Sequence, residues 1–122
     1  TLYDAINQKS LHTNNDHGDR IFGIKFSLDG KYIATACFDG YARVFNTKNF
    51  NQLVEPMPFG FSYGSNIDFS PDTKFLLTRT NVGREENNLV IWDLSTGKEK
   101  FRFEHSSAIF SHAFSIDNIY LY

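Results

Sequence analysis

A histidine, a threonine and an aspartate of the kind that can form a catalytic triad lie close together in the sequence, at His17, Thr35 and Asp39. In such a triad the carboxylate orients the imidazole, and the imidazole removes the proton from the nucleophilic hydroxyl. Threonine is a rarer nucleophile than serine or cysteine, however, and the chain lacks the G-x-S-x-G turn that presents a catalytic serine. We therefore predict that these side chains form a structural hydrogen-bonded network and that the protein is not an enzyme.

The histidines and the single cysteine do not have the spacing of a metal site. The other three histidines are His12, His105 and His112, and none of the four forms an H-x-x-x-H or H-E-x-x-H pair. Cys37 has no second cysteine with which to bind zinc or close an internal disulfide. The sequence also lacks glycine-rich phosphate-binding loops. We predict no metal, no cofactor and a buried, unreactive thiol at Cys37.

Composition and charge argue against direct binding to nucleic acid or membranes. Of the 122 residues, 41% are hydrophobic and 21% are charged, as in a globular protein. The net charge of −2 provides no field that would attract the chain to an anionic polymer or lipid surface. No N-x-[ST] acceptor, secretory leader or long apolar run occurs, which favours an intracellular protein of the cytoplasm or nucleus.

The elements that must position these side chains repeat along the chain. Phe-Ser dipeptides begin at Phe26, Phe69 and Phe114, which are 43 and 45 residues apart. Each is preceded by an apolar residue and followed by an aspartate two positions after the serine, a turn and a second apolar stretch. This pattern predicts two short strands joined by a tight turn, most strongly at Asp29-Gly30.

Two further series of residues keep the same register. The aromatic residues Tyr3, Phe45 and Trp92 each precede Asp or Asn and are 42 and 47 residues apart. His17 and His105 each precede a Phe-Ser dipeptide by nine residues. Three independent markers with one period indicate an internal repeat.

This unit resembles the WD repeat, whose copies form four-stranded antiparallel blades around a central channel. The best match spans His17 to Asn46 and includes the Phe-Ser, Asp29-Gly30 and Asp39-Gly40 dipeptides. The resemblance implies an all-β fold, here a fragment of a β-propeller. It also implies a non-catalytic scaffold for protein–protein interaction within a larger multiprotein complex.

The repeat divides the chain into the end of one blade (1–16), two whole blades (17–54 and 55–104) and the start of another (105–122). The predicted strands are 1–4 and 9–13; 20–26, 31–37, 41–46 and 50–54; 65–69, 74–79, 88–93 and 98–104; 108–114 and 118–122.

Both ends of the sequence fall inside predicted strands. Because a propeller typically closes with four to eight blades, we expect the chain to be part of a longer propeller. The alternative is a dimer in which the two incomplete blades complete each other, giving six blades in all. Either arrangement pairs the edge strands with the rest of the propeller or with another chain.

The resemblance also implies a buried network of His, Ser/Thr, Asp and Trp side chains in each blade. In the first whole blade Phe45 replaces the tryptophan, so the indole-to-hydroxyl bond is missing, while a bond between His17 and Asp39 remains possible. In the second blade Gly60 replaces the histidine. The network positions are His17, Thr35, Asp39 and Phe45; Thr78, Glu86 and Trp92; and His105 in the last repeat.

Two segments depart from the repeat, and the resemblance places both on the same face of the propeller. They are 54–65, rich in proline, glycine and aromatic residues, and 79–88, which carries a four-residue insertion. Such composition is typical of a protein interface. The predicted partner-binding residues are Met57, Phe59, Phe61, Tyr63, Arg84, Glu85 and Glu86. The alternative is that Phe59 and Phe61 fold inward and cap the junction between blades.

A second functional hypothesis places the propeller in a machine that acts on RNA through other proteins. Residues 87–105 loosely resemble propeller subunits of translation initiation factors. A ribosome-assembly factor would be similar in kind. Direct RNA contact would need a basic face, and the alternating Lys98, Lys100 and Arg102 are interrupted by Glu99. We predict protein partners and no direct nucleic-acid binding.

Overall fold

The computed structural model describes residues 1–13, 15–60, 67–82, 86–105, 112–115 and 117. These residues form ten strands and no helix. The strands are β1 (Leu2–Asp4), β2 (Lys9–His12), β3 (Ile21–Phe26), β4 (Tyr32–Cys37), β5 (Tyr41–Asn46), β6 (Met57–Pro58), β7 (Ile67–Phe69), β8 (Phe75–Val82), β9 (Glu86–Asp93) and β10 (Lys98–His105).

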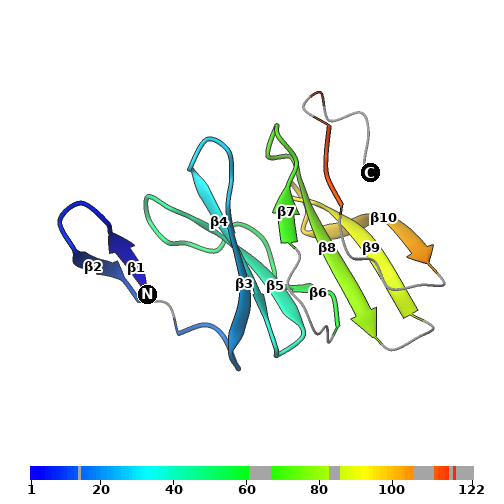
Figure 1. Ribbon diagram of the computed structural model, residues 1–122, viewed down its shortest axis with the longest axis horizontal. Helices are drawn as coiled ribbons and strands as arrows, with labels where there is room; N and C mark the ends of the chain where they lie inside the picture. Colours follow the sequence, from blue (N-terminus) through cyan, green and yellow to red (C-terminus); the bar gives the residue numbers. More distant parts are fainter. Residues whose placement is uncertain (14, 61–66, 83–85, 106–111, 116, 118–122) are drawn as a thin grey trace.

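The strands assemble into two four-stranded antiparallel sheets and one hairpin (Figure 1). The first sheet has the order β3-β4-β5-β6, the second has β10-β9-β8-β7, and β1 pairs only with β2. The two four-stranded sheets lie side by side, and the β1–β2 hairpin stands apart from them. Each four-stranded sheet has the antiparallel strand order expected of a blade, and the all-β prediction is confirmed.

The Phe-Ser-x-Asp motif forms the turn between the first two strands of each sheet. Ser27 Oγ donates to Asp29 Oδ1 over 2.6 Å and accepts from the Tyr32 amide over 3.0 Å. In the second sheet Ser70 Oγ makes the same bond to Asp72 at 2.7 Å. Such side-chain bonds to neighbouring backbone favour turns over continued strand. The repeated Ser and Asp therefore fix where each inner strand ends.

The core lies between the two four-stranded sheets. The first sheet contributes small residues, among them Ala34, Ala36 and Ala42, all with no exposed surface. The second contributes large ones, including Leu76 and Trp92, which are at most 4% exposed. Small residues let the two sheets approach while large ones fill the space, as close packing requires.

The outer strand of the first sheet differs from the prediction at 50–54. The chain forms only an isolated bridge between Phe45 and Gln52, and the strand itself is β6 at Met57–Pro58. Phe50 takes a positive φ of 59° at the end of a turn, so the chain does not extend before residue 51. Pro56 then has no N–H to donate to the ladder. Regular pairing with β5 is therefore delayed to Met57.

The insertion predicted as a longer connection at 79–88 is mostly strand. The β8–β9 ladder continues to a pairing of Val82 with Glu86, so each strand has eight residues against six in β4 and β5. Extending the ladder satisfies backbone groups that a loop would leave to solvent. The predicted strands at 108–114 and 118–122 lie largely outside the described residues, and Phe114 forms a single bridge.

Candidate interaction surface and the repeat network

His17 links the segment before β3 to the middle of the first sheet. Its Nε2 lies 2.7 Å from Thr35 Oγ1, and its ring centroid is 5.9 Å from that of Phe45. Burial lowers the pKa of His17, Arg43 lowers it further, and Asp39 raises it. The Phe45 ring fills the tryptophan position and is only 3% exposed. His17 therefore bonds to the threonine and packs against an aromatic ring that lacks an N–H.

Asp39 is held by groups other than the imidazole. Arg43 Nη2 lies 2.8 Å from Asp39 Oδ2, and the amides of Gly18 and Tyr41 donate to the same carboxylate over 3.1 and 3.0 Å. Burial alone would raise the pKa of Asp39, but these hydrogen bonds, led by that from Arg43, lower it to about 2. Among the described residues His17 Nδ1 has no hydrogen-bond partner.

This geometry does not support nucleophilic catalysis. A triad needs the carboxylate on the imidazole nitrogen opposite the hydroxyl, so that the imidazole can accept a proton and be stabilised as a cation. Asp39 is neutralised by Arg43 instead, and the pKa of His17 is lowered. The cluster fastens the chain before β3 to the turn between β4 and β5.

The second sheet retains the other half of the network. Trp92 Nε1 donates to Thr78 Oγ1 over 2.8 Å in a fully buried environment. Gly60 has a positive φ of 85° and donates its amide to Gly40 O over 3.2 Å. Glu86 begins β9, and His105 ends β10 with an exposed side chain. The two sheets thus keep complementary links, His–Thr in the first and Thr–Trp in the second.

The predicted partner-binding residues fall into two groups. Met57 is completely buried, and Phe59 is 7% exposed with its ring 6.0 Å from Phe22. Both belong to the core between the sheets, which is what the inward-folding alternative expects of Phe59. Neither side chain offers a surface to a partner. Four of the others, Phe61, Tyr63, Arg84 and Glu85, lie outside the described residues, and the Glu86 side chain is not described.

The two segments that depart from the repeat reach the same edge of the sheets. Phe59 and Gly60 donate their amides to Gly40 O, in the turn between β4 and β5, over 3.0 and 3.2 Å. At the equivalent end of the second sheet, β8 ends at Val82 and β9 begins at Glu86, and these two residues pair. We call this the turn edge, and Figure 1 shows where β8 ends and β9 begins at it.

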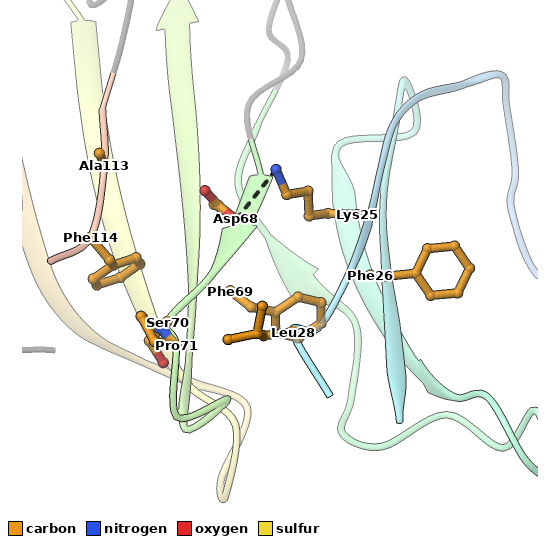
Figure 2. Close-up of a pocket in the computed structure, with 9 residues that line it drawn as sticks. All are labelled: Lys25, Phe26, Leu28, Asp68, Phe69, Ser70, Pro71, Ala113 and Phe114. Carbon is orange, nitrogen blue, oxygen red and sulfur yellow. Dashed lines mark ion pairs between the residues drawn. The ribbon is translucent and has the colours of Figure 1, made fainter. Parts of the chain in front are cut away.

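A cleft of about 350 Å³ lies between β3 and β7, away from the turn edge. Figure 2 shows Lys25 reaching from β3 towards Asp68 on β7, with an Nζ–Oδ1 distance of 3.7 Å. Leu28 and Phe69 line the cleft farther along, and Phe114 closes its far side. Leu28 is 82% exposed. The cleft is mainly apolar, with one partly exposed ion pair.

Sequence reasoning missed four charged positions. Arg43 takes the carboxylate assigned to the histidine, and its place two residues before Phe45 is not part of the repeat pattern. Lys25 and Asp68 form an ion pair between blades that only the packing of the sheets could reveal. Arg79 is 7% exposed although arginine rarely enters a core.

Within the described parts of the chain, no group of three or more His, Cys, Asp or Glu side chains could hold a metal ion. The same parts contain no helix with the length and hydropathy needed to cross a membrane.

Comparison with known proteins identifies a known repeat within the chain. Residues 8–46 match the model of the WD domain, G-beta repeat. The chain is 38% identical over 85 residues to autophagy-related protein 18 of Caenorhabditis elegans and 31% identical over 78 residues to coronin-7 of Bos taurus. These matches cover 66% and 62% of the chain but only 20% and 8% of the relatives.

Solved structures show the same fold. A crystal structure of the eukaryotic initiation factor has a TM-score of 0.72 at 21% identity, covering 93% of the chain and 29% of that structure. A putative 6-phosphogluconolactonase from Bacteroides fragilis has a TM-score of 0.63 at 15% identity, covering 97% and 37%. Repeats of the matched family generally mediate protein–protein interaction and are not catalytic. Residues 8–46 therefore form a WD repeat, and the chain has the all-β fold of a WD-repeat propeller fragment.

Proposed function

We propose that the chain is part of a scaffold that binds a protein partner at the turn edge within a larger complex inside the cell. The observation that carries the proposal is the β8–β9 hairpin, whose strands are two residues longer than β4 and β5. Strands in the interior of a blade are committed to packing, whereas a projecting hairpin is free to contact another molecule.

The described chemistry of the turn edge supports this role. Gly40, Phe59 and Gly60 are tied together by backbone hydrogen bonds, which hold the edge in one conformation. The buried Met57 and Phe59 support the edge from beneath. A preorganised surface loses less entropy when a partner docks. We assign Phe61, Tyr63, Arg84, Glu85 and Glu86 to the contact surface and give Met57 and Phe59 a supporting role.

A hairpin-shortening variant tests the proposal. In the second sheet, residues 81–87 stand where the first sheet has only Phe38, Asp39 and Gly40 between equivalent strand ends. Replacing 81–87 with Phe-Asp-Gly removes the projection and keeps Thr78 and Trp92. We expect at least one cellular protein to be captured about tenfold less by the variant, as for loss of a binding hot spot.

The matched control is Arg102→Ala, on the exposed outer strand β10. It should capture the same proteins as the wild type. Tryptophan fluorescence and the unfolding midpoint should show that both variants remain folded. Identical capture by the wild type and the shortened variant would refute binding at the turn edge.

The hypothesis of a role beside RNA in translation or ribosome assembly stays a prediction. The likeness to the initiation factor, at 21% identity, concerns the fold alone.

A further inference from the structure

The junction between the two four-stranded sheets is apolar at a defined pair of repeat positions. Ala36, directly after Thr35 in β4, belongs to the same buried cluster as Ile67, two residues before Phe69 in β7. Both side chains are at most 7% exposed. An aliphatic residue of one blade and a small residue of the preceding blade therefore belong to the same buried core.

One repeat later, both positions carry nitrogen-rich side chains. Arg79 follows Thr78 as Ala36 follows Thr35, and His112 stands two residues before Phe114. Phe114 packs against the face of the second sheet that points away from the first. Arg79 and His112 therefore occupy the second junction, where the repeat elsewhere has alanine and isoleucine.

Arg79 is buried and forms no ion pair with any of the described residues. It is 7% exposed, and its β9 partner Leu89 belongs to the apolar cluster on this face together with Leu77. Burial lowers the pKa of Arg79. Its Nε and Nη1 atoms have no hydrogen-bond partner in the described part of the chain. A buried guanidinium without acceptors is costly, because it loses its hydration and receives nothing in return.

His112 adds a third unsatisfied nitrogen. Its Nδ1 is buried and has no partner among the described residues. Burial lowers the pKa of His112, Asp68 raises it, and Arg79 and then Lys25 lower it. These charges are therefore close enough to act on one another. Asp68, the one carboxylate in the group, forms an ion pair with Lys25 across the cleft at 3.7 Å. The positive charge of Arg79 is therefore not balanced within this group.

We propose that Arg79 and His112 form a binding site for a small oxyanion at the junction between the second blade and the next repeat. The Nε–H and Nη1–H groups of Arg79 supply two donors, and the His112 imidazole supplies a third. Charge-assisted bonds of this kind satisfy a buried guanidinium with a phosphate or carboxylate group. The anion would hold the segment containing Phe114 against β8.

Anion-dependent unfolding of the full protein tests this site. At equal ionic strength, phosphate or acetate should raise the unfolding midpoint of the wild type relative to chloride. The comparison variant is R79A/H112I, which recreates the Ala36–Ile67 pair of the first junction. At about ten times the dissociation constant, the wild type should gain roughly 3–5 °C more than this variant.

Two controls separate specific binding from general salt effects. Phosphate stabilises most proteins by exclusion from their surface, so R79A/H112I should show only that background. Arg102→Ala, which removes an exposed arginine, should respond like the wild type. In titration calorimetry with inorganic phosphate or acetate, R79A should bind at least about tenfold more weakly than the wild type.

The phosphate and acetate arms tell whether a phosphate or a carboxylate group is preferred, and a specific response to either one supports the site. The proposal is overturned if neither anion stabilises the wild type beyond R79A/H112I. It is also overturned if R79A is destabilised equally in chloride, phosphate and acetate, since Arg79 would then have a purely structural role.

Discussion

Ile24 and Phe26 in β3 occupy the same repeat positions as Ile67 and Phe69 in β7, yet their environments differ greatly. Ile24 and Phe26 are 58% and 48% exposed, whereas Ile67 and Phe69 are 7% and 6% exposed. The residue types and strand positions are identical, so neither composition nor pairing explains the contrast. The second pair is buried because the first sheet packs against it. In this fold a blade depends on its neighbour for burial of its inner strand.

The largest predicted effect is the difference between the stability losses caused by Phe69→Ala and by Phe26→Ala. Phe69→Ala should destabilise the 122-residue chain by about 3–5 kcal/mol, because it opens a cavity between the sheets. Phe26→Ala should cost less than about 1.5 kcal/mol, because little apolar area is lost. Denaturant unfolding of both variants measures the difference. Equal losses would break the comparison and show that another sheet covers β3.

The next largest predicted effect concerns the hydrogen bond between Trp92 and Thr78, which has no equivalent in the first sheet. Trp92→Phe, which copies Phe45 of the first sheet, should destabilise the protein by about 1–3 kcal/mol, because the buried Thr78 hydroxyl loses its indole partner. Thermal and denaturant unfolding provide the measurement. If Trp92→Phe unfolds like the wild type, the Thr78–Trp92 bond contributes nothing to the second sheet.

Acid should weaken the first sheet through Asp39. The pKa of Asp39 is lowered to about 2 in the folded state, from an ordinary value of 3.8. Its stabilising contribution is therefore present above pH 4 and is lost as the pH falls from about 4 to 2, by roughly 1–2 kcal/mol. Asp39→Asn should remove this part of the pH dependence. An unchanged pH profile in the variant would refute the role of the Arg43–Asp39 pair.

The smallest effect should come from the ion pair that joins the two sheets. The Lys25 and Asp68 side chains are 52% and 32% exposed, and their charged atoms lie 3.7 Å apart. Exposed pairs of this kind are worth about 0–1 kcal/mol. Lys25→Ala should shift the unfolding midpoint only slightly, and the shift should vanish in high salt. A large shift would mean that the pair, and not apolar packing, joins the sheets.

The parts of the fold that local chemistry determines were predictable from the sequence. The side chains of Ser27 and Asp29, which are two residues apart, form a hydrogen bond. This local bond accounts for the turn and for the strands on either side of it. The bond between Thr78 and Trp92 was implied by the family resemblance and is present in the structure. The position of β6 was not predictable in this way, because it depends on where the chain can resume pairing after Pro56.

The candidate site was less predictable, because burial depends on neighbouring sheets. Met57 and Phe59 have the composition of an interface, and only the packing of two sheets places them in the core. Arg43, four residues after Asp39 in the sequence, binds the carboxylate that the repeat assigns to His17. No repeat position specifies this contact. The projection of the β8–β9 hairpin was visible as an insertion, but its strand pairing was not.

Chemical labelling of the Cys37 thiol can report local opening of the first sheet. The side chain has no exposed surface, and its thiol donates to Asp19 O over 3.1 Å, at the chain segment just before β3. A thiol reagent can reach this sulfur only when that segment detaches from the end of β4. The rate of labelling therefore counts opening events in the native protein, and it does so at the place where His17 and Asp39 fasten the same segment.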